Sequence, residues 1–347
     1  MSSIRFCLCQ INTTVGDIKG NSDLISAGIE RARSVRADIA LFPELSITGY
    51  PPEDLLMKKG FVRANLAALR ALAEKTRGIT AVVGFVDLRH EKIYNSAAVL
   101  KDGAVNSVYD KINLPNYGVF DEKRYFEPGN RPLIIEEKGA KISVSICEDI
   151  WQECGVLDKT RGKADFMLNL SASPYHTEKW KQRFSMLKKK AVYYRANLLY
   201  CNLVGGQDEL VFDGHSLVID KKGRMKAQAW QFAEYDLVID MNAKREASSK
   251  AEKSVVIPAY KPIPKDEEIY EALKLGVRDY VVKNGFKKVL VALSGGVDSA
   301  LVTAIACDAL GRDNVTVIFM PSKFSSKESL RDAEKLSENL GLKLKII

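Results

Sequence analysis

The chain has 347 residues, 46% hydrophobic and 28% charged, which allows a sizeable core in each of two ordinary domains. Its formal net charge of +8 suits nucleic acid and anionic small molecules equally well. Lysines alternate with acidic residues except at Lys188–Lys190, which we interpret as the solvent-exposed face of a helix, so we expect no nucleic-acid partner.

The apolar runs and the cysteines exclude further classes of protein. No run approaches the ~18–20 apolar residues of a membrane span. Residues 1–12 lack the charged and apolar regions of a signal peptide, so we expect a cytoplasmic protein without a membrane partner. The six cysteines form no C-x-x-C pair, which argues against structural zinc and a disulfide framework. They are Cys7, Cys9, Cys147, Cys154, Cys201 and Cys307.

The first ~240 residues alternate strand-like apolar runs with longer helical patterns, as expected for a layered α/β domain. The predicted strands are Ile4–Gln10, Ile39–Phe42, Ala81–Val86, Ala97–Leu100, Lys141–Cys147, Phe166–Leu170, Leu198–Asn202, Ser216–Ile219 and Tyr235–Asp240. The predicted helices are Asn21–Arg36, Gly60–Thr76 and Thr177–Arg195. Asp102-Gly103 is a two-residue hairpin signal. The mixture predicts a sandwich of sheets flanked by helices.

We predict three regions: a first domain over residues 1–242, a linker over 243–264 and a second domain over 265–347. The linker is poor in apolar residues and contains three prolines. The second domain opens with a helix and continues as β-α-β-α-β, which is half of an open parallel sheet. A three-stranded parallel sheet leaves an open edge and a poorly covered face, so we expect this domain to be incomplete in the present sequence.

Three segments of the first domain carry candidate catalytic residues. Cys147 follows an alternating strand, and α/β sheets place catalytic groups at such strand ends. A thiol needs a base or cation beside it to act as a nucleophile. Glu44 follows a buried strand in Phe42-Pro-Glu44, and Lys111 lies in Lys111-Ile-Asn-Leu-Pro. Taken singly, such a cysteine is more often a buried core residue, and such a glutamate or lysine is more often a surface ion-pair partner than catalytic.

Together, these segments resemble the nitrilase or carbon–nitrogen hydrolase superfamily, whose Glu–Lys–Cys triad has this chain order. The resemblance extends over the first ~240 residues and implies a four-layer αββα sandwich. It implies that Glu44 is the general base, Cys147 the nucleophile, and Lys111 with the backbone N–H of Glu148 the oxyanion support. Glu122 matches a second glutamate often found beside the lysine in this superfamily.

Three more residues resemble those that hold glutamine in the glutaminase branch of this superfamily. They are Tyr117, Glu148 and Ser173. An acidic side chain such as Glu148 pairs naturally with the α-ammonium group of an amino acid. The alternatives are a packing aromatic for Tyr117 and a Ser-Pro turn for Ser173.

The second domain contains the most distinctive local motif, Ser294-Gly-Gly-Val-Asp298-Ser299, between a buried strand and a helix. Two glycines and a helix N-terminus form an anion-binding nest for phosphate. The motif lacks the lysine of a P-loop. It resembles the signature of the ATP pyrophosphatase family, which implies a Rossmann-like parallel α/β domain. The implied ATP contacts are Ser294, Gly295, Gly296, Asp298, Ser299 and Met320, with Asp298 also helping to hold magnesium.

A nitrilase-type glutaminase followed by this motif resembles the glutamine-dependent NAD synthetase family. The resemblance implies glutamine, ATP and deamido-NAD as substrates, magnesium as the ion, no prosthetic group, and ammonia passing internally between two sites. We also expect a homo-oligomer. Two alternatives stay open: a free-standing nitrilase-class amidase acting on another small amide, and a non-catalytic scaffold subunit that binds nucleotide. The complete Glu44, Lys111 and Cys147 set argues against the scaffold.

Overall fold

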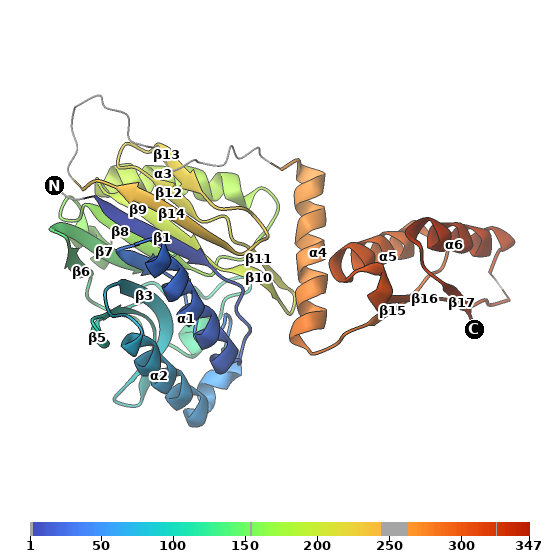
Figure 1. Cartoon of the computed structure of the whole chain (residues 1–347), viewed down its shortest axis with the longest axis horizontal. Coiled ribbons are helices and arrows are strands. Elements are labelled where there is room, and N and C mark those ends of the chain that lie inside the picture. Colours follow the sequence, from blue (N-terminus) through green and yellow to red (C-terminus); the bar gives the residue numbers. More distant parts are fainter. Residues whose placement is uncertain (1–2, 153–154, 244–262, 324) are drawn as a thin grey trace. The chain divides into compact units, whose positions relative to one another are not determined.

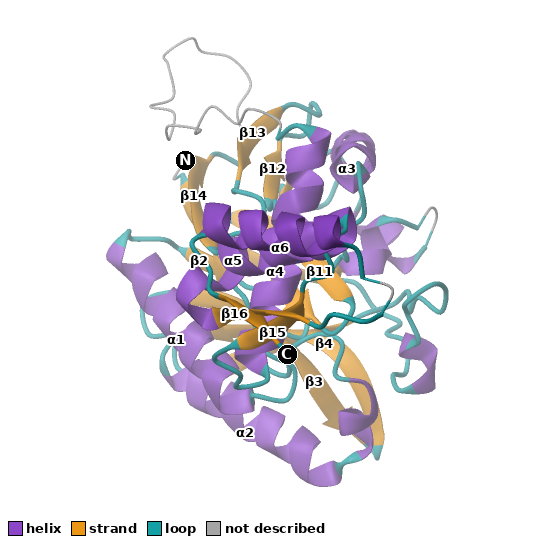
Figure 2. Cartoon of the chain, turned by 90° about the vertical axis from the view of Figure 1, so that its right-hand side faces the viewer, coloured by secondary structure: helices purple, strands orange, loops and turns teal. Residues whose placement is uncertain are grey.

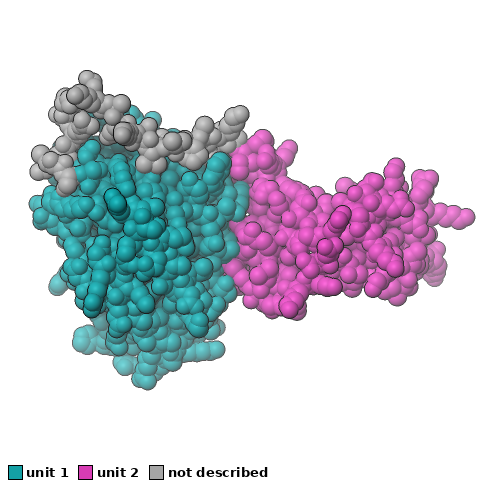
Figure 3. Space-filling model, in the orientation of Figure 1, with its two compact units in different colours: residues 1–205, 212–262 teal, residues 206–211, 263–347 magenta. Residues whose placement is uncertain are grey.

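The computed structural model describes residues 3–152, 155–243, 263–323 and 325–347. The chain divides into two compact units (Figure 3). Unit 1 comprises residues 1–205 and 212–262, and unit 2 comprises residues 206–211 and 263–347. Most of the predicted linker, and Cys154, lie outside the described residues.

Unit 1 contains two six-stranded mixed sheets (Figure 1). The first has the order β14-β1-β2-β3-β4-β5 and the second the order β13-β12-β9-β8-β7-β6. The strands of the first sheet are β1 (Ile4–Gln10), β2 (Ile39–Leu41), β3 (Thr80–Arg89), β4 (Lys92–Lys101), β5 (Ala104–Asp110) and β14 (Tyr235–Met241). Those of the second are β6 (Leu133–Glu137), β7 (Ala140–Ile146), β8 (Phe166–Ser171), β9 (Asn197–Asn202), β12 (Leu217–Ile219) and β13 (Met225–Gln228). A ribbon of β10 (Val204–Gln207) and β11 (Leu210–Asp213) completes the strands up to residue 243.

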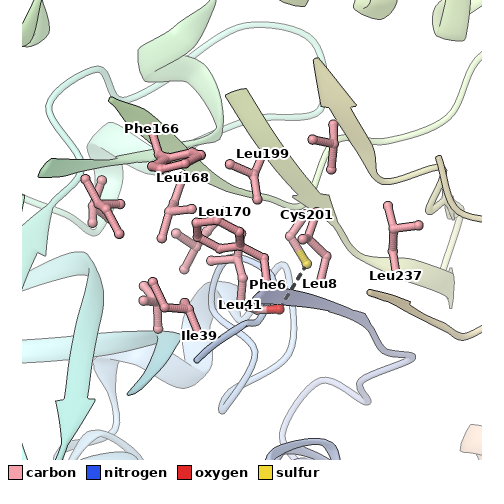
Figure 4. Close-up of a cluster of buried hydrophobic side chains, with 14 of the residues drawn as sticks. Phe6, Leu8, Ile39, Leu41, Phe166, Leu168, Leu170, Leu199, Cys201 and Leu237 are labelled. Atoms are coloured by element: carbon pink, nitrogen blue, oxygen red, sulfur yellow. Dashed lines mark hydrogen bonds between the residues drawn. The ribbon is translucent and has the colours of Figure 1, made fainter. Parts of the chain in front are cut away.

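Three hydrophobic clusters define four layers in unit 1. The central cluster lies between the two sheets, where Phe6 packs against Phe166 (Figure 4). A second cluster joins the first sheet to α1 (Ile18–Ser34) and α2 (Lys59–Glu74). A third joins the second sheet to α3 (Lys179–Tyr194). The helix–sheet–sheet–helix order confirms the predicted αββα sandwich.

The sequence prediction missed several strands among residues 3–243, and it also missed the turn between β3 and β4. The Asp102-Gly103 hairpin was predicted correctly, and both residues have positive φ. The β3–β4 hairpin turns at His90 and Glu91, which have φ of 50° and 61°. Because neither is a glycine or asparagine, this turn carries no signal in the sequence. Strands β5, β6, β10, β11 and β13 were not predicted.

Unit 2 is a three-stranded parallel sheet with the order β15-β16-β17. Its elements are α4 (Lys265–Lys283), β15 (Val289–Ala292), α5 (Val297–Leu310), β16 (Val315–Phe319), α6 (Lys327–Leu340) and β17 (Leu344–Ile346). Both α5 and α6 pack on one face of this sheet (Figure 2). On the other face, Leu290 is 62% exposed. Among the described residues of both units, no helix has the length and apolar character to cross a membrane.

Candidate active site

Cys147 lies at the carboxyl end of β7, where the strand enters a 3-10 turn over Cys147–Ile150. The residue is buried and has φ of 39°, in the left-handed region that non-glycine residues rarely adopt. Such strained conformations persist only where the surrounding structure enforces them, and they gather at functional sites. The fold therefore holds the backbone of Cys147 in a strained conformation, at a cost in folding free energy.

Glu44 follows β2 in a fully buried turn. Its Oε2 accepts a hydrogen bond from the backbone N–H of Ala172 at 3.0 Å, and its Oε1 accepts one from Asn95 Nδ2 at 2.7 Å. The turn needs a glycine on the neighbouring strand, because a Cβ at Gly84 would lie 2.4 Å from the Leu45 nitrogen. Several independent contacts thus fix the Glu44 carboxylate.

Lys111 follows β5, and its fully buried Nζ lies between two carboxylates. It is 2.7 Å from Glu44 Oε1 and 2.7 Å from Glu122 Oε1. Asn95 Nδ2 lies 3.4 Å from Glu122 Oε2, and the Tyr50 hydroxyl donates to Glu122 Oε1 at 2.9 Å. The predicted Glu44, Lys111 and Glu122 therefore meet in one buried cluster.

Charges in this cluster determine the protonation states near the thiol. Burial would lower the pKa of Lys111, but Glu122 and Glu44 outweigh it, so the pKa is raised and the ammonium form is held. Burial, followed by the repulsion of Glu44, raises the pKa of Cys147 against the opposing effect of Lys111. The resting thiol is therefore neutral, and it needs a base at the moment of attack.

Glu122 shares its lysine with a second carboxylate. Burial and the charge of Glu44, partly opposed by Lys111, raise the pKa of Glu122 to about 7. Two carboxylates around one ammonium carry a net negative charge if both are ionised. Glu122 can therefore hold a proton near neutral pH while Glu44 accepts three donors.

The predicted glutamine contacts lie only partly together. Tyr117 is 58% exposed, and its hydroxyl donates to Glu148 Oε2 at 2.9 Å. Both residues line a cleft of about 630 Å³. Gln152 lines the same cleft and donates to Glu148 Oε1 at 2.5 Å. Ser173 is buried, and it is not one of the described residues that line this cleft. Its backbone N–H donates to Asn202 Oδ1.

The sequence prediction missed four polar residues around this site. Asn95 and Tyr50 orient the two glutamates, and Gln152 orients Glu148. Lys179 opens α3, and its pKa is lowered by burial and then by Arg183, with the charges of Cys147 and Glu148 also acting on it. Only the fold brings these residues to the site, so no local pattern identifies them.

The phosphate loop of unit 2 has its own local bonding. The Ser294 and Ser299 hydroxyls lie 3.0 Å apart, and the Gly296 N–H donates to Ser294 Oγ at 3.3 Å. Gly295 has φ of 83°, and a Cβ there would lie 2.3 Å from the Ser329 carbonyl oxygen. Asp298 and Met320 are exposed. Five of the six predicted ATP contacts thus lie in the loop before α5 and in its first turn, and Met320 lies outside this segment.

A metal centre is poorly supported by the potential ligand groups among the described residues. Asp298 belongs to no group of three potential ligands there. Cys7, Cys9 and Asp236 form the one such group found, with ligand atoms within 4.8 Å of one another. However, Asp236 already pairs with Arg31, and a hydrogen bond to Cys7 and burial raise the pKa of Cys9. A metal there would have to displace an arginine and deprotonate a buried thiol.

Two family models match consecutive parts of the chain. The Carbon-nitrogen hydrolase family matches residues 5–268, and the NAD synthase family matches residues 269–347. The glutamine-dependent NAD(+) synthetase of Thermotoga maritima is 43% identical over 378 residues, and that of Aquifex aeolicus is 45% identical over 372. The alignments cover 100% and 99% of this chain but only 65% of each relative. The chain thus spans about two thirds of their length.

Among solved structures, one match covers nearly the whole chain and another covers about two thirds of it. The glutamine-dependent NAD+ synthetase of Acinetobacter baumannii in complex with ADP matches with a TM-score of 0.92 at 37% identity, over 99% of this chain and 64% of that one. An amidase from Nesterenkonia sp. AN1, in which acrylamide has added to the active-site cysteine, matches with a TM-score of 0.61 at 28% identity. That match covers 69% of this chain and 94% of the amidase.

Proposed function

This chain belongs to the carbon–nitrogen hydrolase family, and on that basis we propose that unit 1 hydrolyses glutamine to glutamate and ammonia. The observation that carries the proposal is the buried Lys111 ammonium between Glu44 and Glu122, next to the strained residue Cys147. All three charged groups affect the pKa of the Cys147 thiol. A surface ion pair would need neither the burial nor the strain.

In the proposed reaction, Glu44 takes the thiol proton as Cys147 Sγ attacks the carboxamide carbon of glutamine. Lys111 Nζ and the Glu148 N–H stabilise the oxyanion. The tetrahedral intermediate then collapses, Glu44 returns the proton to the leaving nitrogen, and ammonia leaves a γ-glutamyl thioester. Glu44 next takes a proton from water, which attacks the thioester and releases glutamate. The thiol regains its proton in this last step.

We further propose that Glu148 binds the α-ammonium group of glutamine. Two donors, Tyr117 and Gln152, already orient its carboxylate in the cleft. Lys179 would supply the positive charge for the α-carboxylate; burial and then Arg183 lower its pKa, and Asp213 and Glu148 oppose that shift. Ser173 remains a proposed contact from the family resemblance alone.

For the complete protein we propose glutamine-dependent NAD synthesis, by analogy with the relatives of that name. Unit 2 would bind the phosphates of ATP at Ser294–Ser299. The ADP complex of the Acinetobacter baumannii relative supports the use of an adenine nucleotide. The exposed Asp298 would hold magnesium together with phosphate oxygens, and magnesium would neutralise charge on those phosphates. Deamido-NAD would then take the AMP group from ATP with release of pyrophosphate, and ammonia would displace AMP from the adenylate to give NAD. Assembly as a homo-oligomer belongs to the same proposal.

Ammonia release from glutamine, asparagine and short aliphatic amides tests the glutaminase assignment. We expect glutamine to be preferred, because Glu148 and Lys179 provide charges for its amino-acid end. A preference for aliphatic amides would favour the free-standing amidase that the Nesterenkonia match suggests. Absence of release from every amide, with ATP still bound, would favour the scaffold. Size-exclusion chromatography tests the oligomer.

A further inference from the structure

Asp149 lies beside the catalytic cluster but has no role in the reaction described above. Its side chain is 1% exposed and accepts hydrogen bonds from four residues in three segments. An ionised carboxylate has about four lone-pair positions. Those of Asp149 are filled by the protein itself, so the carboxylate has no capacity left to bind substrate or to act as a base.

The bonds of Asp149 join the chain next to the lysine to the chain next to the nucleophile. Its Oδ1 accepts from the backbone N–H of Ile112 at 3.1 Å and of Asn113 at 2.8 Å, directly after Lys111. Its Oδ2 accepts from the backbone N–H of Ile146 at 3.1 Å, directly before Cys147. One rigid carboxylate thus spans both segments.

The two segments come from different layers of unit 1. Lys111 follows β5 in the first sheet, whereas Cys147 follows β7 in the second. The Tyr109 hydroxyl on β5 adds a fourth tie, to Asp149 Oδ2 at 2.8 Å. Asp149 therefore fixes the distance between two catalytic groups that the chain connects only through residues 112–146.

This distance matters because the oxyanion needs donors about 3 Å from its oxygen, and a misplacement of ~1 Å can cost ~10²-fold in rate. The left-handed backbone of Cys147 adds a second need, since strain persists only where neighbours enforce it. The Ile146 N–H that Asp149 holds is adjacent to that strained residue.

We propose that Asp149 is a positioning residue. It holds the turn at Cys147 and the residues that follow Lys111 at a fixed distance from each other, although they belong to different sheets. The proposal rests on the proposed glutaminase function and assigns Asp149 no contact with substrate. Replacing it by asparagine keeps the shape but places an NH2 group opposite backbone N–H donors, so at least one tie must break.

The test is a double-mutant cycle in the full 347-residue chain. Asp149→Asn, Lys111→Ala and the double variant are compared with wild type in the rate at which iodoacetamide alkylates Cys147, read by mass spectrometry. Melting temperature and far-ultraviolet circular dichroism report the folded fraction. Where Lys111 is present, we expect Asp149→Asn to slow alkylation at least tenfold. Where Lys111 is already replaced by alanine, the same substitution should slow it less than twofold. Equal factors in both backgrounds would overturn the proposal, because a purely structural role does not depend on the lysine.

Two further variants keep the test decisive if Asp149→Asn does not fold. Tyr109→Phe removes one tie and leaves the three backbone bonds, so kcat for glutamine should stay within about threefold of wild type. Asn113→Ala removes a side-chain donor 3.2 Å from Oδ1, with the same expectation. Because the same three backbone bonds remain, the combined Tyr109→Phe and Asn113→Ala variant should lose no more than the product of the two single losses, about tenfold in kcat. A larger loss would contradict the proposal, because the backbone bonds of Asp149 would then not suffice to hold the two segments. If wild type does not hydrolyse glutamine, the glutaminase assignment fails, but the alkylation cycle still decides the role of Asp149.

Discussion

The catalytic cluster of unit 1 and the phosphate loop of unit 2 are built in opposite ways. Glu44, Lys111 and Cys147 come from three distant segments and are buried. Ser294–Ser299 is one continuous segment, a loop that runs into the start of α5, and its Asp298 is exposed. Glu44, Lys111 and Glu122 are hydrogen-bonded to protein groups, whereas the segment Ser294–Ser299 is largely exposed. The fold preorganises the first site, whereas the second would be completed by a bound phosphate.

This difference has an energetic consequence. Lys111 is balanced by two carboxylates in an environment where an unpaired charge is costly. Substitutions in the cluster therefore act on both reaction and stability. Substitutions in the loop act mainly through the backbone conformation that phosphate binding requires. The predictions below separate these two behaviours.

The largest effect is expected from Glu44→Gln, which removes the base for both proton transfers while keeping the shape of the side chain. We expect kcat for glutamine hydrolysis to fall by about 10⁴-fold, near the upper end for a general base. Glu148→Gln is the matched control, and it should raise KM more than it lowers kcat. Retention of more than a tenth of the wild-type kcat in Glu44→Gln would exclude the general-base role.

Lys111→Ala should lower kcat by about 10²–10³-fold, because it removes one donor to the oxyanion. It also leaves the Glu44 and Glu122 carboxylates without their shared cation, so the melting temperature should fall as well. Lys19→Ala, which breaks a solvent-exposed ion pair with Asp23, should keep kcat within about threefold. Rates are divided by the folded fraction. Equal losses in the two variants would show that the position of Lys111 has no special importance.

Gly295→Ala should weaken binding of a non-hydrolysable ATP analogue to the chain at least tenfold, measured by calorimetry. The added Cβ would meet the Ser329 backbone, and the left-handed φ would be strained. Gly285→Ala has a similar φ of 77° with nothing near the added Cβ. This control should bind the analogue like wild type, at a small cost in stability. If both variants bind equally well, the close packing of the loop on Ser329 is not needed for nucleotide binding.

The smallest expected effect concerns the pH dependence of stability through Glu122. Its pKa is raised to about 7, so native protein binds this proton more tightly than unfolded protein does. The resulting stabilisation is fully present below the ordinary glutamate pKa of 4.5 and is lost as the pH rises to about 7. The melting temperature should therefore fall between pH 5 and pH 8 by a few degrees more in wild type than in Glu122→Gln.

Glu136→Gln, which alters an exposed carboxylate on β6, serves as the control for this pH series. It should follow the wild-type profile. Parallel profiles for wild type and Glu122→Gln would mean that Glu122 does not exchange its proton in this range.

The contrast between a site built from distant segments and one built from consecutive residues also explains what could be predicted from the sequence. The loop motif and its strand–helix context lie within consecutive residues, so glycine chemistry alone indicated a phosphate site. Glu44, Lys111, Cys147 and Glu122 were identified by resemblance to a family, since each is ordinary when taken singly. The structure brings Glu44, Lys111 and Glu122 into hydrogen-bonding contact, with the thiol within reach of their charges.

Residues that act only by orienting others were not predicted. Asn95 lies in the middle of β4 and Tyr50 in a proline-rich turn, and neither pattern suggests a hydrogen bond to a glutamate. Asp149 was not among the predicted site residues, because its ties to Ile112 and Asn113 join segments that follow strands of different sheets. Such roles depend on packing between distant segments, and no local propensity records them.

Covalent labelling with a glutamine analogue that carries an electrophile tests the central claim most directly. The account predicts that peptide mass spectrometry finds the adduct on Cys147, that excess glutamine prevents it, and that Cys147→Ala remains unlabelled. Cys201 is the internal control, since it is a buried core thiol whose Sγ contacts the Leu41 carbonyl at 3.3 Å. Glutamine-protected labelling of Cys201 or Cys154, or labelling that persists in Cys147→Ala, would contradict the assignment of Cys147 as the nucleophile.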